Sequence, residues 1–305
     1  GYSDKDINKI AIKVINGGPL TTLNPIEEVE LAEMLIDIHP WADQMKTART
    51  GGEIMSVAVR IARAATGKSK ILFCGYHGWH DWYLSSNLTK KDGLKDHLLP
   101  GLEPLGVPYE MTGSVIPFKF NDWNDLNKII KKHIKDSAAV IIEPARDKLV
   151  DKKFLKEIRR LCSKYKTILI FDEITSAWRN ETAGIHKEIG INPDMAAFGK
   201  TISNGVPMAA LIGKKEIMEN AKKTYISSTN WPERLGPATA VEFLKKHKKL
   251  NAGKILIKKG KEIRKIWENA SKNAGLKIQI SGIYPLSSFK IIHDEWPVII
   301  TYFIQ

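Results

Sequence analysis

The sequence is poor in cysteine and has no long apolar run. Its only two cysteines, Cys74 and Cys162, each lie inside an apolar stretch, and no CxxC spacing is present. This pattern predicts buried free thiols in a reducing compartment. No run approaches the roughly 18 apolar residues that cross a bilayer, and residues 1–9 lack the apolar segment of a signal peptide. We therefore expect a cytoplasmic protein with no membrane partner.

Acidic residues are also scarce relative to basic ones. There are 34 Asp and Glu against 47 Lys and Arg, which gives a formal net charge of +13. Clustered cations can bind a nucleic-acid backbone. Here, however, the lysines are scattered along helical stretches such as 243–267, without interleaved stacking aromatics. The charge therefore favours a solvated, lysine-rich surface over the rival interpretation, a nucleic-acid-binding protein.

Apolar, strand-like runs alternate with helical patterns along a chain long enough to bury a sizeable core, as one large domain or a large and a small one. Strands that are apolar throughout indicate a mostly parallel sheet covered by helices on both faces, an α/β fold. We expect strands in 68–75, 114–120, 138–144, 166–173, 195–198 and 208–213, helices in 26–38, 52–66, 123–134 and 151–166, and a long loop over the site in 84–113.

Lys200 stands directly after one of these strands and before a second apolar run. A lysine held at a sheet edge is partly desolvated, and its amine can then lose its proton near neutral pH. Such an amine can attack a carbonyl and form a Schiff base, either with an aldehyde substrate or with pyridoxal phosphate. A solvated surface lysine is the alternative, because lysine is rarely buried.

Other polar and aromatic residues gather at strand ends. Tyr76, Glu143 and Asp172 lie at or just past the ends of strands, where open α/β sheets bind their ligands. Asp172 precedes Lys200 by 28 residues. A carboxylate there either caps a helix or forms an ion pair, or it keeps the nitrogen of a pyridine ring protonated. Tyr76 and Ile174 can supply flat or apolar surfaces for that ring.

A glycine turn and an aromatic stretch complete the pattern. Thr50, Gly51 and Gly52 lead into a helix, so this turn is either an anion cradle or an ordinary helix cap. The stretch 76–83 is the most aromatic part of the sequence and predicts the floor of a pocket. Its histidines, His77 and His80, with Asp81, are also candidate metal ligands, although no HExxH pattern accompanies them.

In order and spacing, these segments resemble the class III pyridoxal-phosphate-dependent aminotransferases, and within that family they are most similar to glutamate-1-semialdehyde aminomutase and its relatives. The resemblance covers about residues 25–243 and is carried by NPIEEVELAEML, RTGGEIMSVAVRIARAATGKSKI, GYHGW, VIIEPAR, LIFDEITSAWR, GINPDMAAFGKTISNGVPMAALIG and SSTNWPERLGPATA.

The resemblance implies a fold-type-I homodimer with active sites at the subunit interface. Lys200 would be the Schiff-base lysine and the proton carrier, and Asp172 would be the partner of the pyridine nitrogen. Gly51 and Gly52 would form the phosphate turn, and Tyr76 would stack on the cofactor ring with Ile174 on the opposite face. His77 would also contact the cofactor, and Glu143 would lie beside cofactor and substrate. Thr229 would reach the phosphate of the cofactor in the neighbouring subunit. The ligands would be an amino donor and a carbonyl acceptor.

The chain departs from the family pattern at three places. Gly52 stands where the family carries a hydroxyl, and residues 230–233 replace a small-residue segment. Trp79 and Trp82 occupy the loop where substrate contacts are made. We therefore keep two alternatives to the aminomutase: an aminotransferase for another amine or an amino sugar, and a truncated chain that binds pyridoxal phosphate without full activity.

The expected division is a cofactor-binding domain over 1–245, without the N-terminal segment of the family, followed by 246–305. A connector helix, which we expect over 240–273, would cross into this second part, and the first strands of a truncated small domain would lie within 275–294.

Overall fold

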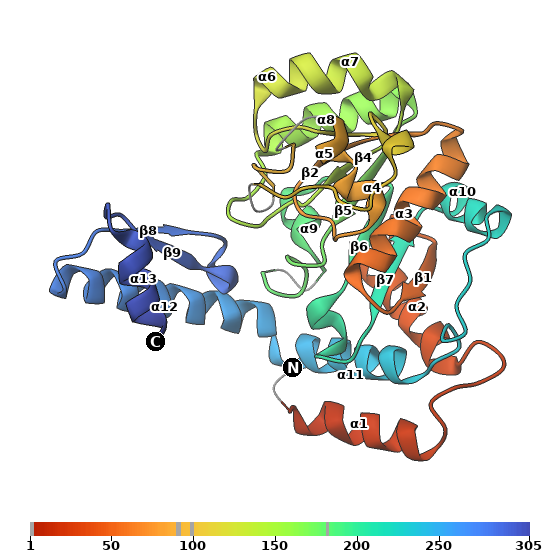
Figure 1. Cartoon of the computed structure of the whole chain (residues 1–305). Helices are drawn as coiled ribbons and strands as arrows, with labels where there is room; N and C mark the ends of the chain where they lie inside the picture. Colours follow the sequence, from red (N-terminus) through yellow and green to blue (C-terminus); the bar gives the residue numbers. More distant parts are fainter. Residues whose placement is uncertain (1–2, 90–92, 98–100, 181–182) are drawn as a thin grey trace.

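The computed structural model describes residues 3–89, 93–97, 101–180 and 183–305, and its centre is a seven-stranded sheet (Figure 1). The strand order is β1-β7-β6-β5-β4-β2-β3. Neighbouring strands are parallel except at β7, which runs antiparallel to both β1 and β6. The predicted, mostly parallel sheet is therefore confirmed. Its strands are β1 Gln44–Ala48, β2 Lys70–Cys74, β3 Val115–Pro117, β4 Ser137–Ile142, β5 Ile168–Asp172, β6 Met195–Phe198 and β7 Ala209–Gly213.

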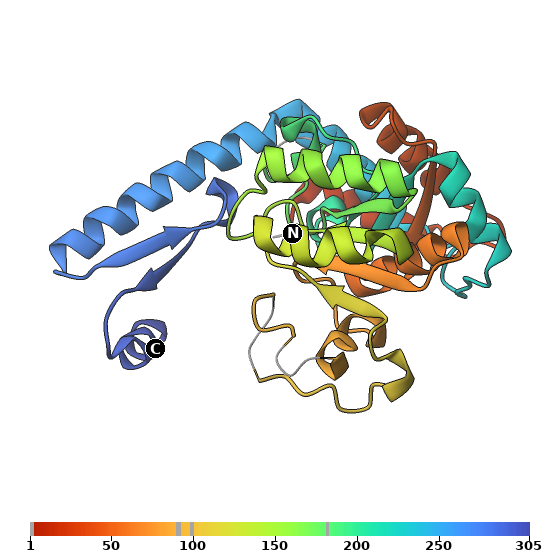
Figure 2. The ribbon, with the colours of Figure 1, turned by 90° about the horizontal axis from the view of Figure 1, so that it is seen from above.

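Helices cover both faces of this sheet (Figures 1 and 2). Successive strand residues point to opposite faces, as the strand period of two requires. Ile71 and Ile170 pack in one buried cluster with α3 (Gly51–Thr66), whereas Leu72 packs in another with α8 (Lys152–Tyr165). Apolar side chains on both faces of one strand explain why these strands read as unbroken apolar runs.

The longer helices begin and end at the predicted signals. The Oγ1 atom of Thr50 caps α3 by accepting a hydrogen bond from the Glu53 N–H at 3.2 Å. Gly67, with φ of +65°, ends the same helix in the left-handed conformation that glycine adopts readily. The helix α2 spans Ile26–Ile38, which is the predicted range.

A third layer was only partly visible in the sequence. The helix α1 (Lys5–Asn16) packs against α11 (Leu235–Leu250), and α2 packs against α11 as well. Residues of α2 and α11 share a buried cluster with Phe198 of β6 and Ile212 of β7. The sequence interpretation missed α1, although its buried Ile7 and Val14 lie at helical spacing, and it missed β1, in which Gln44 and Lys46 interrupt the apolar pattern.

The expected connector helix over 240–273 was wrong in one respect: it is two helices. The helix α11 ends at Leu250, Asn251 has φ of +52°, and α12 spans Ala252–Asn273. A left-handed residue breaks the helical hydrogen-bond ladder, and asparagine tolerates it better than most residues do. Beyond α12 the strands β8 (Ile278–Ser281) and β9 (Ser288–Ile291) pair antiparallel, and α13 (Trp296–Ile304) follows (Figure 2).

The remaining elements are short. The expected helix over 123–134 is a continuous helical segment to residue 136, with a π-helical stretch at Leu126–Ile130. Within the expected loop 84–113, residues 90–92 and 98–100 lie outside the described residues, and short helical turns occur at each end. The short helices are α4 Asp81–Leu84, α5 Ser86–Thr89, α6 Trp123–Asp125, α7 Lys131–His133, α9 Ile185–Ile189 and α10 Lys215–Met218; 3₁₀ turns occupy Tyr109–Met111, Ile134–Asp136, Lys200–Ser203, Glu219–Lys223 and Tyr284–Leu286.

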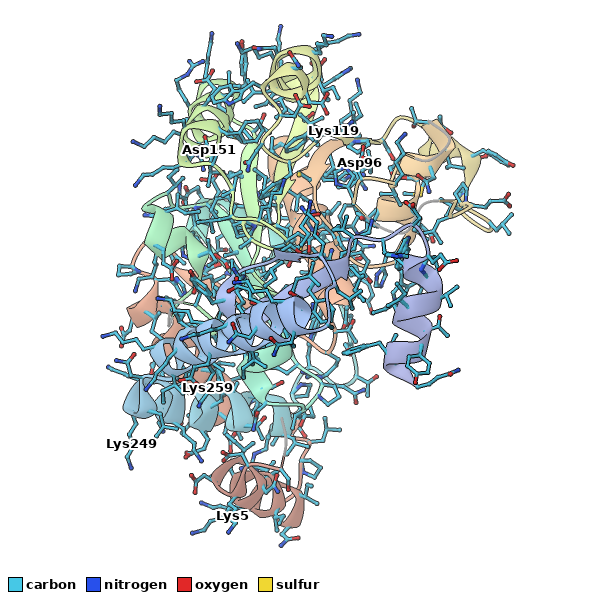
Figure 3. The ribbon with its side chains drawn as sticks, turned by 90° about the vertical axis from the view of Figure 1, so that its left-hand side faces the viewer. Lys5, Asp96, Lys119, Asp151, Lys249 and Lys259 are labelled. Carbon is cyan, nitrogen blue, oxygen red and sulfur yellow. The ribbon has the colours of Figure 1, made fainter. Side chains whose placement is uncertain are left out.

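Basic side chains extend outward from the helices, as the dispersed lysines predict. Lys5, Lys249 and Lys259 are exposed on α1, α11 and α12 (Figure 3). Within the described ranges, none of the helices is both long and apolar enough to span a bilayer. Both cysteines are buried free thiols, as predicted.

Candidate active site

The carboxyl ends of β2, β4, β5 and β6 bring four of the predicted residues to one edge of the sheet. The backbone N–H of Tyr76, after β2, donates to Oε2 of Glu143, after β4, at 3.2 Å. The charges of Asp172, at the end of β5, and of Glu143 both act on the amine of Lys200, after β6. The sequence rule that ligand-binding residues follow parallel strands thus describes this site.

Asp172 is buried, with 3% of its surface exposed, and both carboxylate oxygens are engaged. Oδ2 lies 2.8 Å from Nδ1 of His77, and Oδ1 accepts a hydrogen bond from the Ile174 N–H at 3.1 Å. The other ring nitrogen of His77, Nε2, lies 3.2 Å from the carbonyl oxygen of Cys74. Because both ring nitrogens face acceptor oxygens, hydrogen bonds at both need a proton on each nitrogen. His77 thus holds one oxygen of Asp172, and the Cys74 carbonyl fixes the orientation of the His77 ring.

Glu143 is the second buried acid of the site. Burial raises the pKa of its carboxyl, and the nearby charge of Asp172 raises it further. The guanidinium of Arg146 acts against this shift from 3.4 Å, and it also lies over the Tyr76 ring, 5.2 Å from the ring centroid. Gly75 permits the close approach of β2 to Glu143: it has φ of +114°, and a Cβ atom built on it would lie 2.6 Å from the Cβ of Glu143.

Lys200 follows Gly199 at the end of β6 and has φ of +50°, a conformation that residues other than glycine rarely adopt. Its Nζ donates to the Oγ1 atom of Thr175 at 2.7 Å. Although much of the Lys200 surface is exposed, the protein around its amine removes enough water to lower its pKa from 10.5; Asp172 and Glu143 act in the opposite direction. Its amine is therefore more often uncharged than that of an ordinary lysine.

Ile174 joins the glycine turn to the lysine. A Cβ atom built on Gly51 would lie 3.1 Å from its Cδ1, and one built on Gly199 would lie 3.2 Å from its Cγ2. Its side chain therefore fills the space between the N-terminus of α3 and the residue before Lys200. The Ile174 surface is 8% exposed, so the residue forms an apolar wall of the site.

The residues at the N-terminus of α3 fit a phosphate group. The first N–H groups of a helix have no partner within the helix, and the helix dipole attracts an anion. A side chain at Gly52 would collide with His80, and one at Gly51 would press tightly against Ile174, so the backbone there is bare. Near Gly52, the Nδ1 atom of His80 is buried and has no hydrogen-bond partner among the described residues. This bare cradle, with Tyr76, Asp172 and Lys200 beside it, fits pyridoxal phosphate.

Thr229 makes no contact with the other predicted residues among those that the structure describes. It is exposed on the loop between α10 and α11. Trp231 anchors this loop: its Nε1 donates to the Thr47 carbonyl at 3.0 Å, and Lys46 lies 3.8 Å from the centroid of its ring. Arg49 also donates to the Asn230 carbonyl. The loop is thus held against β1 and presents Thr229 outward.

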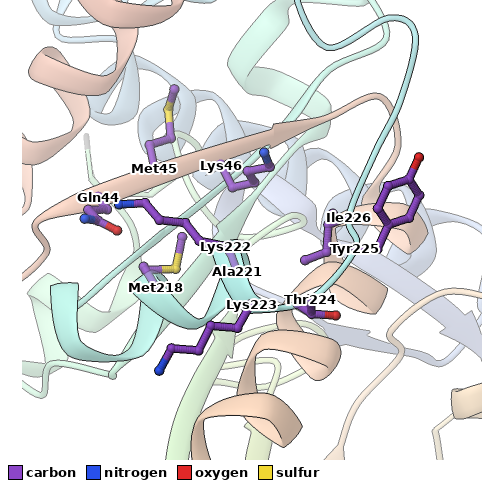
Figure 4. A pocket seen from close by; sticks show the side chains of 10 residues that line it. All are labelled: Gln44, Met45, Lys46, Met218, Ala221, Lys222, Lys223, Thr224, Tyr225 and Ile226. Atoms are coloured by element: carbon purple, nitrogen blue, oxygen red, sulfur yellow. The ribbon is translucent and has the colours of Figure 1, made fainter.

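Two cavities border these elements. One, of about 670 Å³, is lined by residues that include Gly75, Glu143 and Arg146, and so adjoins the site. The other, of about 510 Å³, lies between β1 and residues 218–226, and its lining includes Lys46 but none of the cofactor residues above (Figure 4). Within the described residues, no cluster of His, Cys, Asp and Glu could hold a metal ion, and His77 is engaged by Asp172.

Sequence reasoning missed three polar contacts. Thr175, the partner of Lys200, could have been noticed as a hydroxyl three residues after Asp172. Arg146, which contacts Glu143, likewise follows it by three residues. A buried chain from Glu173 through His186 to His39 left no pattern in the sequence: Glu173 Oε1 lies 2.9 Å from His186 Nδ1, and His186 Nε2 lies 3.1 Å from His39 Nδ1.

This sheet and this set of residues define a fold-type-I pyridoxal-phosphate-dependent enzyme. The family model for class-III aminotransferases matches residues 1–275. The chain belongs to this family, whose members are aminotransferases and aminomutases that use pyridoxal 5′-phosphate.

Relatives include the 3-aminobutyryl-CoA aminotransferase of Cloacimonas acidaminovorans (strain Evry), which is 30% identical over 300 residues, 95% of this chain. The glutamate-1-semialdehyde 2,1-aminomutase of Clostridium botulinum (strain Eklund 17B / Type B) is 35% identical over 226 residues, 72% of this chain. The chain spans 68% of the length of the first relative and 52% of the second.

Among solved structures, the pyridoxal-phosphate form of the FumI protein of Sphingopyxis sp. MTA144 superposes with a TM-score of 0.85 at 25% identity. The match covers 96% of this chain and 69% of that one. The sequence interpretation of the family, the fold and the cofactor is confirmed.

Proposed function

We propose that this chain transfers amino groups with pyridoxal phosphate bound through Lys200, in a glutamate-1-semialdehyde aminomutase-like reaction. One observation carries the proposal: the depressed pKa of Lys200 at the same sheet edge as the buried His77–Asp172 pair. The cofactor, when bound, supplies the aldehyde that accepts an amine and the ring that accepts electrons from the substrate carbon.

Each residue has a distinct role in this proposal. Lys200 Nζ would hold the cofactor through its aldehyde, and its free amine would carry the proton of the substrate carbon. Thr175 Oγ1 holds that amine by accepting a hydrogen bond. Asp172, held by His77, would be the partner that keeps the pyridine nitrogen protonated. Because the carboxylate already has its partner, it needs no rearrangement during the reaction.

The remaining residues bind the cofactor or complete its site. Gly51 and Gly52 would offer N–H groups to the phosphate, Tyr76 and Ile174 would enclose the ring, and Glu143 would lie beside the substrate. The outward position of Thr229 supports a homodimer in which it reaches the phosphate of a second subunit. We also propose the domain division at 245 and 246, with the amino donor and acceptor as ligands and the cytoplasm as the compartment.

The relatives leave two chemistries for the substrate. A 3-aminobutyryl-CoA aminotransferase among them favours transfer between molecules, and aminomutases favour transfer within one molecule. The cavity of about 670 Å³ beside Glu143 is the candidate substrate site for either chemistry. An aminotransferase for another amine or amino sugar is therefore the second candidate, and a chain that binds the cofactor without turnover is the third.

Absorbance tests the role of Lys200. Wild-type protein mixed with pyridoxal phosphate is expected to develop a band at about 410–430 nm, which Lys200→Ala loses and the matched control Lys222→Ala, at an exposed lysine, keeps. No band in the wild type would refute the proposal. Adding candidate amino donors one at a time should then bleach the band for a true substrate. A band that no donor bleaches would favour the chain that binds without turnover.

Oligomeric state tests the role of Thr229. Light scattering should give a dimer for the wild type. Thr229→Ala should remain a dimer yet bind pyridoxal phosphate more weakly. A monomer with full cofactor affinity would contradict the shared site.

A further inference from the structure

We infer that His80 is a ligand of the cofactor phosphate and takes the place of the side chain that Gly52 lacks. The inference rests on the proposed function, which places the phosphate at the N-terminus of α3. It concerns a residue that the family resemblance does not assign, and it addresses the missing hydroxyl at position 52.

The imidazole of His80 occupies the space that a side chain at position 52 would need. A Cβ atom built on Gly52 would lie 2.7 Å from Cε1 and 2.8 Å from Nδ1 of His80. A Cβ atom does not approach a non-bonded atom this closely, so the chain can carry either a side chain at position 52 or the imidazole in this place. The imidazole of His80 therefore fills the space that a hydroxyl-bearing side chain at position 52 would occupy.

The backbone around Gly78 brings the imidazole there. Gly78 has φ of +103°, and a Cβ atom built on it would lie 2.9 Å from the Cα of Gly52. The turn after β2 thus packs directly on the first turn of α3. The ring of Trp79 stacks on that of His80, with centroids 4.7 Å apart and 19° between the planes, which fixes the ring from the outer side.

The free nitrogen of His80 is the second observation. Nδ1 is buried, and no described residue accepts or donates a hydrogen bond there. Buried polar atoms almost always have a partner, and an unpaired one costs about 1–3 kcal/mol. An anion at the N-terminus of α3 would be that partner: with its proton on Nδ1, the imidazole donates alongside the N–H groups of the helix.

Paired titrations of the apoprotein test this role, because pyridoxal has the ring and aldehyde of the cofactor but no phosphate. We expect His80→Ala to bind pyridoxal phosphate roughly ten- to a hundredfold more weakly, the effect of losing one hydrogen bond to a charged group, and to bind pyridoxal as the wild type does. His133→Ala, a change in another partly exposed histidine, should alter neither affinity. The readouts are absorbance and the ³¹P chemical shift of the bound phosphate.

A second variant restores the hydroxyl. Gly52→Ser in the His80→Ala background places a hydroxyl in the vacated space, and we expect it to regain most of the lost affinity for pyridoxal phosphate. In the wild-type background the same serine collides with the imidazole and should weaken binding. If His80→Ala does not fold, His80→Asn takes its place in the titrations. Asparagine keeps a smaller hydrogen-bond donor at this position, so His80→Asn should lose less affinity for pyridoxal phosphate than Gly52→Ser loses in the wild-type background.

Four outcomes decide the inference. A selective loss for pyridoxal phosphate, rescued by the serine, supports it. Equal losses for both ligands would show that His80 only packs, and unchanged affinities would show that it does not contact the phosphate; either result overturns the inference and leaves the role of Lys200 intact. A wild type that binds neither ligand overturns both proposals.

Discussion

The Nδ1 atom of His77 lies 2.8 Å from Oδ2 of Asp172, and both side chains are almost completely buried. The pair joins the turn after β2 to the end of β5, and the second nitrogen of His77 is held by the Cys74 carbonyl. A buried carboxylate without a partner would be strongly disfavoured. His77 therefore makes a buried negative charge possible at the point of the sheet where the chemistry of a pyridine ring needs one.

The charge of Asp172 also acts on Lys200, which leads to a prediction about pH. Burial lowers the pKa of Lys200, and Asp172 partly offsets that shift. Asp172→Asn removes the offset, so the pKa of Lys200 should fall further. The pH midpoint for reductive methylation of Lys200, followed by NMR, should move to lower pH than in the wild type.

Glu143→Gln is the matched variant for this measurement. Glu143 raises the pKa of Lys200 less than Asp172 does. The midpoint of Lys200 methylation in Glu143→Gln should therefore also move to lower pH, but by a smaller step. An unchanged midpoint in both variants would show that these carboxyl groups carry no negative charge near the amine.

Much of the fold could be predicted because the strands of a covered parallel sheet are apolar on both faces. Strands β2, β4 and β5 are unbroken apolar runs, and the residues after such strands meet at one edge, which is why Tyr76, Glu143 and Asp172 could be placed beside Lys200. β1 could not be found this way: its residues Gln44 and Lys46 interrupt the pattern, and only the pairing with β7 makes it a strand.

Contacts that depend on backbone conformation were out of reach. The approach of His80 to Gly52 requires the positive φ of Gly78, and the break between α11 and α12 requires that of Asn251. Both are local features without a periodic signature. The hydrogen bond from Lys200 to Thr175 likewise depends on the position of two loops that follow neighbouring strands.

Gly75 gives a prediction about the construction of the site. Gly75→Ala forces a side chain into the left-handed half of conformational space and against Glu143, at 2.6 Å. We expect a loss of about 2–4 kcal/mol in the free energy of unfolding, from backbone strain and overpacking together. Urea denaturation measures it.

Gly67→Ala is the control for Gly75. Gly67 also has a positive φ, of +65°, yet nothing lies within 4 Å of its built Cβ atom. Its substitution should cost only the strain, about 1–2 kcal/mol. Equal losses in the two variants would mean that the contact with Glu143 relaxes freely.

Glu143 gives a prediction about stability and pH. Its pKa in the folded chain is raised above the ordinary value of 4.5, so the folded state binds a proton that the unfolded state releases first. The wild type should therefore lose stability from this group as the pH rises from about 4.5 through the raised pKa, whereas Glu143→Gln has no such loss. Melting temperatures at pH 5 and pH 8 test it: the variant should gain on the wild type at the higher pH. A variant that gains at the lower pH instead would mean a depressed pKa.

Asp194 gives the last prediction, on how the strand before Lys200 is held. The residue lies just ahead of β6 and is 6% exposed. Oδ2 accepts from the Leu169 N–H at 2.9 Å and from Arg159 at 2.8 Å, and Oδ1 accepts from Lys214 at 2.7 Å. One carboxylate thus ties β5, the start of β6, the end of β7 and α8 together.

Asp194→Ala leaves an N–H group and two partly exposed cations without their acceptor. Breaking such a pair costs about 3–5 kcal/mol when both partners are buried, and the exposure of Lys214 and Arg159 places this case near the lower limit. We expect about 3 kcal/mol by urea denaturation, with cofactor affinity unchanged below the unfolding transition, because Asp194 lies at the opposite end of β6 from Lys200. Glu157→Ala, which breaks an exposed pair with Arg160, should barely change the unfolding midpoint. A small effect of Asp194→Ala, similar to that of the control, would show that backbone pairing alone holds these strands.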